Sequence, residues 1–152
     1  MGAAVFVVIC ELAGGLGAVF TTPRIGTWYT TLNKPEIAPP NWIFAPVWTI
    51  LFAMMGVAAY LVWRKRKQDA RAEEALMIFS AQLGLNIIWS ALFFGLRSPQ
   101  NAFAEIIILW LAILATIVRF KMISKNAAYL LLPYLLWVTF AGYLNFLIYT
   151  LN

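Results

Sequence analysis

The chain has 152 residues, of which 63% are hydrophobic and only 11% are charged, and its net charge is +5. Soluble globular domains carry about 45–50% apolar and about 25% charged residues. This composition argues against a soluble enzyme, a nucleic-acid-binding domain and a disordered chain, and we expect a protein embedded in the lipid bilayer. The absence of histidine and the single cysteine, Cys10, exclude a histidine-based triad, a histidine-ligated metal and an intrachain disulfide.

Five apolar segments are long enough to cross a bilayer, which takes about 20 residues. In chain order they cover residues 1–20, 43–63, 75–96, 102–120 and 127–151. We therefore predict an all-α fold, a single membrane domain of five transmembrane helices spanning residues 1–152. The first segment lacks the basic n-region of a signal peptide and Glu11 interrupts it, so we interpret it as a helix of the mature protein.

Lysine and arginine residues are distributed unequally between the two sets of loops. The second and fourth loops with their flanks carry Arg64, Lys65, Arg66, Lys67, Arg71, Arg119, Lys121 and Lys125, and the other side carries Arg24, Lys34 and Arg97. Cytoplasmic loops are enriched in these residues. We therefore predict that the N-terminus and loops two and four are cytoplasmic and that the C-terminus lies on the opposite side.

The first loop, residues 21–42, is long for so small a chain. Prolines should prevent a long helix there, and they stand at Pro23, Pro35, Pro39 and Pro40. The loop also contains Trp28, Tyr29 and Trp42, so it is not a hydrophilic linker. Long loops with aromatic residues are typical of packed lids and interface anchors.

Three predicted helices carry polar or aromatic residues at helical spacing. The first such stripe is Gln82, Asn86 and Ser90, bordered by Trp89 and Phe93; the second is Pro133, Trp137, Ala141 and Asn145; the third is Trp48, Phe52, Met55 and Ala59. Residues four apart share a helix face. One interpretation is that the polar residues hold helices together and the aromatic residues pack. The other is that the three stripes enclose a flat, aromatic-lined cavity.

Two acidic residues fall within predicted helices. Glu105 is near a helix start, where a carboxylate is favoured by the helix dipole, so we interpret it as structural. Glu11 is in the middle of the first helix, where it is a candidate proton-relay group, an ion-pair partner, or a protonated and hydrogen-bonded carboxyl. Small residues on that same helix, Cys10, Gly14 and Ala18, form a candidate packing or dimer face.

Several ordered motifs resemble one known family. The stretch from Trp28 to Trp63 reads WYTTLNKPEIAPPNWIFAPVWTILFAMMGVAAYLVW, and two further blocks are QLGLNIIWSALFF (82–94) and PYLLWVTFAGYLN (133–145). Together they resemble the tryptophan-rich sensory protein family, TspO, which includes the animal translocator protein or peripheral benzodiazepine receptor. The resemblance covers nearly the whole chain.

The resemblance implies a membrane receptor or sensor that is often a homodimer and that binds ligands under the first loop. Family ligands include tetrapyrroles such as protoporphyrin and haem, sterols and benzodiazepine-type compounds, and some members transport or photo-degrade porphyrin. The implied ligand-binding residues here are Tyr29, Pro39, Pro40, Trp48, Phe52, Asn86, Trp89, Ser90, Trp137 and Ala141. Photochemistry, if present, would involve Trp48 and Trp137. We expect no required cofactor and no metal, with porphyrin entering as a ligand.

Two details refine this expectation. Without histidine, iron would depend on tyrosine, cysteine or methionine, so we rank free-base porphyrin above haem. The C-terminal stretch LNFLIYTLN has Phe146 where the family's sterol motif has tyrosine and no basic residue after it, which weakens the case for sterol binding.

Lys34 and Arg24 are candidates to meet porphyrin carboxylates. The alternative function is a small proton-coupled exporter of hydrophobic compounds that uses Glu11.

Overall fold

The structure is a computed structural model that describes residues 2–152. Within these residues it contains five long helices and no strands, and all five helices are long and apolar enough to cross a membrane. They are α1 (Ala3–Ile25), α2 (Phe44–Trp63), α3 (Arg71–Ser90), α4 (Pro99–Lys121) and α5 (Lys125–Leu151). A π-helical turn, η3 (Ala91–Gly95), extends α3, and the first loop holds two 3-10 turns, η1 (Tyr29–Thr31) and η2 (Asn41–Ile43). The predicted all-α membrane fold is confirmed.

The helix ends differ from the prediction where polar residues extend a helix beyond its apolar segment. Helix α1 continues through Pro23 to Ile25, so the first loop is shorter than predicted. Helix α4 begins at Pro99, and the Ser98 hydroxyl accepts a hydrogen bond from the Asn101 backbone N–H. Serine at the N-cap with proline just inside is a favoured helix start. Glu105 therefore lies in the second turn of α4, one turn farther from the helix start than the predicted segment 102–120 would place it.

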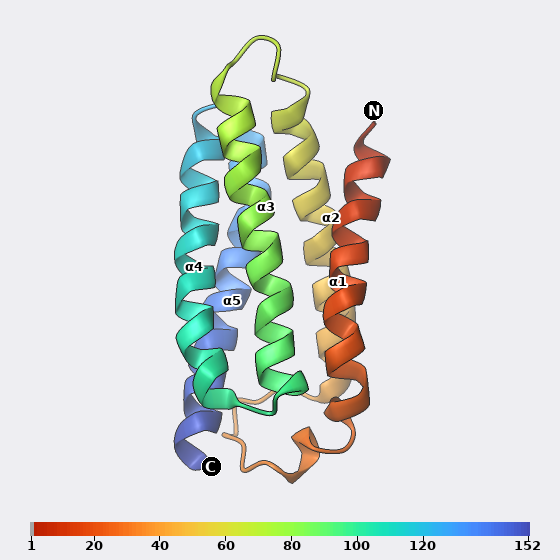
Figure 1. Cartoon of the computed structure of the whole chain (residues 1–152), viewed down its shortest axis with the longest axis vertical. Coiled ribbons are helices and arrows are strands. Elements are labelled where there is room, and N and C mark those ends of the chain that lie inside the picture. The colour runs from red at the N-terminus through yellow and green to blue at the C-terminus, as the bar shows by residue number, and fades with distance from the viewer. Residues whose placement is uncertain (1) are drawn as a thin grey trace.

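The helices form a closed ring. Helix α1 packs on α2 and α3, α2 packs on α5, and α4 packs on both α3 and α5. The N-terminus and the α2–α3 and α4–α5 connections lie at one end of the bundle, while the first loop, the α3–α4 connection and the C-terminus lie at the other (Figure 1). The loops that carry most of the basic residues therefore share one end, although their side of the membrane stays a prediction.

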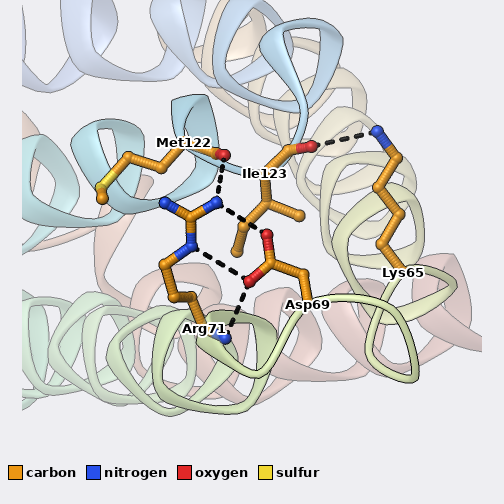
Figure 2. A network of polar contacts seen from close by, with 5 residues as sticks. All are labelled: Lys65, Asp69, Arg71, Met122 and Ile123. Atoms are coloured by element: carbon orange, nitrogen blue, oxygen red, sulfur yellow. Dashed lines mark hydrogen bonds and ion pairs between the residues drawn. The ribbon is translucent and has the colours of Figure 1, made fainter.

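Figure 2 shows a polar clamp that joins the α2–α3 and α4–α5 connections. Asp69 accepts hydrogen bonds from the Arg71 backbone N–H (2.9 Å) and guanidinium (2.8 and 3.0 Å). Arg71 also donates to the Met122 carbonyl (3.1 Å), and the Lys65 ammonium donates to the Ile123 carbonyl (3.0 Å). Both cations thus bind carbonyls where α4 ends, at the negative end of its helix dipole. These bonds lower the pKa of Asp69 from 3.8 to about 2.

Small residues bring α1 very close to its neighbours. A Cβ at Gly56 would lie 2.5 Å from the backbone Cα of Val7, and one at Gly14 would lie 2.7 Å from the Phe52 ring. Cys10, on the same face as Gly14, is buried. Cys10 and Gly14 of the predicted small-residue stripe thus face neighbouring helices of the same chain.

Candidate functional site

A cavity of about 450 Å³ lies among α1, α2, α3 and α5, beneath the first loop. Eight of the ten residues expected to bind ligand line it: Tyr29, Trp48, Phe52, Asn86, Trp89, Ser90, Trp137 and Ala141. The two prolines, Pro39 and Pro40, do not. Pro40 instead precedes the short turn η2, where its carbonyl accepts from the Ile43 N–H (3.1 Å), and the loop contributes Tyr29 and Asn41 to the cavity.

The first loop closes the cavity by burying Tyr29, which is only 2% exposed. The Tyr29 ring packs edge-on against Phe44, with ring centroids 6.3 Å apart, and also contacts Phe93 and Phe94. Burial raises the pKa of Tyr29 to about 12, so its hydroxyl is protonated at physiological pH. Its hydroxyl has no hydrogen-bond partner within residues 2–152.

Lys34 and Asn33 hold the loop in place. The Lys34 ammonium donates to the carbonyls of Tyr29 (2.9 Å) and Leu32 (3.4 Å) and lies 4.7 Å from the centre of the Tyr29 ring. Asn33 and Asn152 exchange hydrogen bonds of 3.0 and 3.1 Å, which tie the loop to the end of α5. Neither Lys34 nor Arg24 lines the cavity, so the structure does not place either at a ligand's carboxylate.

Aromatic rings form most of the cavity wall. The Trp48 and Phe52 rings lie 5.6 Å apart on α2, and Trp137 of α5 contacts Phe44 edge-on at 6.3 Å. On α3, Trp89 stacks on Phe93 at 5.1 Å. Such faces suit flat aromatic ligands, because rings stack offset or edge-to-face.

Hydrogen bonds between helices fix the polar side of the cavity. Asn86 donates to the Tyr134 hydroxyl (2.8 Å), which donates in turn to the Gln82 side-chain oxygen (2.7 Å). Nearer the loop, the Trp89 indole donates to Asn145 (3.0 Å). Gln82 is fully buried and does not line the cavity. Both interpretations of the polar stripe therefore apply: Gln82 holds helices together, whereas Asn86 does so and also lines the cavity.

Three polar atoms in cavity-lining residues are buried and have no partner within residues 2–152. They are the Tyr29 hydroxyl, the Trp137 indole N–H and one carboxylate oxygen of Glu11. Buried polar groups are normally hydrogen-bonded, so the clustering of three unpaired atoms in residues that line one cavity favours a ligand site there. Glu105 also has both oxygens unpaired, but it is buried away from the cavity lining.

Sequence reasoning missed several lining residues. Phe44 lies one turn before Trp48, and Phe140 lies three residues after Trp137 on the same side of α5, so helical spacing could have found them. Phe94 was missed as well: it lines the cavity from the π turn η3 together with Phe93, which the sequence placed beside the polar stripe. No residue pattern in the sequence indicated this turn.

Comparison with known proteins identifies the family. Residues 6–150 match the model of the TspO/MBR family. The chain is 45% identical to the tryptophan-rich protein TspO of Chlorobaculum tepidum, over 95% of this chain and 91% of that protein. It is 37% identical to the translocator protein of Bos taurus, over 93% of this chain and 84% of that protein, and 35% identical to the tryptophan-rich sensory protein of Cereibacter sphaeroides, over 97% and 89%. The chain therefore belongs to the TspO/MBR family of integral membrane proteins.

Proposed function

We propose that this membrane sensor or translocator binds porphyrin, and also benzodiazepine-type or other hydrophobic ligands, in the cavity under its first loop. The observation that supports the proposal is one cavity whose lining residues combine tryptophan faces with two unpaired donors, the Tyr29 hydroxyl and the Trp137 indole N–H. The role as a membrane sensor or translocator follows from the family and the five spanning helices.

The physical match is between flat ring surfaces. A porphyrin is a broad planar π-system with two carboxylates. Each aromatic contact with Trp48 or Trp137 would contribute about 0.5–1.5 kcal/mol of binding free energy, in addition to the gain from burying apolar surface. The unpaired donors of Tyr29 and Trp137 would hydrogen-bond to acceptor atoms of the ligand, which relieves the cost of burying them. The volume of about 450 Å³ falls within the range of about 300–1,000 Å³ typical of small-molecule sites.

The test is a titration with protoporphyrin of the purified protein in detergent, in the dark, followed by tryptophan fluorescence. We expect saturable quenching, with affinity about tenfold lower in the Trp48→Phe, Trp137→Phe double variant, because two stacking contacts are reduced. Trp110→Phe is the matched control, because Trp110 does not line the cavity and its indole bonds to Thr139. Linear quenching of equal slope in all three proteins would mean partition into the micelle and would overturn the proposal.

Light-dependent porphyrin degradation is the activity we propose to test next. Trp48 and Trp137 both line the cavity, so a bound, photoexcited porphyrin would lie against an oxidisable indole. Loss of porphyrin absorbance that requires light and oxygen, and that slows in Trp137→Phe, would support this activity. The same loss in the dark would contradict it.

The exporter alternative has weaker support. Glu11 does line the cavity, but small exporters of that kind usually have four short helices and no long folded first loop. If Glu11→Gln abolished pH-driven uptake of a hydrophobic dye into proteoliposomes, export would become the better proposal.

A homodimer is proposed from the family resemblance. The small residues Cys10 and Gly14, considered above as a dimer face, pack within the chain, so a dimer would use other surfaces. Light scattering of the protein in detergent should give twice the protomer mass; a single-protomer mass would contradict the proposal.

A further inference from the structure

The cavity opens sideways between α1 and α2. Six of its lining residues are exposed, and all come from α1, α2 or the turn η2 that precedes α2: Gly15, Ala18, Thr22, Asn41, Ala45 and Thr49. At Gly15, nothing lies within 4 Å of where a Cβ would stand. The lining residues from α3, η3 and α5 are all buried or half-buried. Because α1 and α2 are membrane-spanning, much of this opening faces the hydrocarbon of the bilayer.

Glu11 stands at that opening. It shares a face of α1 with Gly15, Ala18 and Thr22, since these residues follow it at four, seven and eleven positions. Its side chain is half-buried and lines the cavity, and one carboxylate oxygen is buried without a hydrogen-bond partner.

Glu11 is also the one charged residue among those that line the cavity. The two ion pairs within residues 2–152, Arg71–Asp69 and Arg119–Glu74, involve neither Glu11 nor any other cavity-lining residue. A carboxyl group in the middle of a spanning helix is costly unless a partner satisfies it. No cation within residues 2–152 pairs with Glu11, so a charged Glu11 carboxylate would take its partner from outside this part of the chain.

We propose that Glu11 is a specificity-determining residue that selects aromatic ligands carrying a protonated nitrogen. The cation would bind the Glu11 carboxylate at the opening, and the rings would lie among Trp48, Phe52 and Trp137. Phe52 is close to Glu11, because it packs against the next turn of α1 at Gly14. Aromatic faces themselves attract cations, which reinforces this choice. The inference rests on the proposed function, because it uses the same cavity. It names a different class of ligand, since these ligands are cations whereas a porphyrin carries two carboxylates.

The test compares two related dyes on the purified protein in detergent. Proflavine is a planar cation at neutral pH, and acridine is its neutral parent ring. Each is titrated against the wild-type protein, Glu11→Gln and Glu105→Gln, with protoporphyrin as a third ligand. Glutamine keeps the shape of Glu11 and removes its charge. Glu105→Gln is the matched control, because it alters an acidic residue within a spanning helix that does not line the cavity.

We expect the wild-type protein and Glu105→Gln to bind proflavine more tightly than acridine. Glu11→Gln should lose about tenfold in affinity for proflavine, the usual scale for a hydrogen bond to a charged group, and keep its affinity for acridine and protoporphyrin. If Glu11→Gln weakened all three ligands equally, Glu11 would be structural and the inference would be wrong. If protoporphyrin bound but the wild-type protein did not prefer proflavine, the inference alone would fail. If none of the three bound saturably, the proposed function would fail with it.

Discussion

Tyr134 is the residue on which the buried polar contacts between α3 and α5 depend. Its hydroxyl accepts from Asn86 and donates to Gln82, and its side chain is 1% exposed. Tyr134→Phe would leave the Asn86 side-chain N–H and the Gln82 side-chain oxygen without this partner, and Gln82 is fully buried. We expect the free energy of unfolding in detergent to fall by about 1–2 kcal/mol, as measured by thermal or denaturant unfolding.

The control for that change is Tyr143→Phe. Tyr143 lies on the same helix but is 57% exposed, so removing its hydroxyl leaves no buried group unpaired. We expect its stability to stay within about 0.5 kcal/mol of the wild type. Equal stability of both variants would show that the hydroxyl of Tyr134 contributes nothing net.

The pH dependence of Asp69 follows from its hydrogen bonds to Arg71. Its pKa is lowered to about 2 from 3.8, so the folded state favours the charged form. A lowered pKa gives stability that is fully present above the ordinary value and is lost as the pH falls through the lowered one. We expect the melting temperatures of the wild type and Asp69→Asn to differ by a constant amount from neutral pH to about pH 4. The difference should shrink as the pH falls from about 4 and should be lost only below about pH 2.

The difference in melting temperature isolates the contribution of Asp69, because the other carboxyl groups titrate in both proteins. A difference that persisted unchanged at pH 2 would mean that Asp69 acts through its shape rather than its charge.

At the level of helices, the contact between α1 and α2 depends on Gly56. A Cβ there would lie 2.5 and 2.6 Å from the Cα and N atoms of Val7, and backbone atoms cannot move aside as a side chain can. Gly56→Ala would push the two helices apart, and we expect it to cost about 1–3 kcal/mol of stability in thermal unfolding. Gly84→Ala is the matched control, because nothing lies within 4 Å of its added methyl group.

In Gly84→Ala the gain in helix propensity should leave the protein as stable or more stable by up to about 1 kcal/mol. If Gly56→Ala and Gly84→Ala had the same stability, the close approach of α1 to α2 would not require a glycine at position 56.

The existence of each helix was predictable because a bilayer requires long apolar segments, and all five were found. Their ends were not, because polar turns lengthen them: α1 runs through Pro23 and α4 starts at Pro99. The Ser98–Pro99 pair is a helix-start signal that the apolar segments alone did not reveal.

The cavity was predictable where it lies on regular helices. Spacing of four placed Trp48 and Phe52, and Asn86 and Ser90, on shared faces. Pro39 and Pro40 were expected there from the family resemblance and do not line it, because the path of a loop is set by its tertiary contacts rather than by periodicity. Lys34 was expected to meet a ligand's carboxylate, but its ammonium binds carbonyls of the loop instead. Phe94 reaches the cavity through a π turn that the sequence did not indicate.

The whole bundle separates its two ends by charge. The connection with Gln68 lies at the end that carries most lysines and arginines, and the loop with Thr30 lies at the other (Figure 1). Since cytoplasmic loops are rich in these residues, we expect Gln68 on the cytoplasmic side and Thr30 outside. Single cysteines introduced at these exposed positions report their sides, because the native Cys10 is 1% exposed and should react slowly.

In intact spheroplasts of an expression host, a membrane-impermeant maleimide should label Thr30→Cys at once and Gln68→Cys only after permeabilisation. The unmodified protein, with Cys10 alone, gives the background. The opposite labelling pattern would mean an inverted orientation. The cavity end of the bundle, under the first loop, would then face the cytoplasm, and ligands reaching it from water would come from that side. Ligands that enter between α1 and α2 would be unaffected, because that opening faces the bilayer in either orientation.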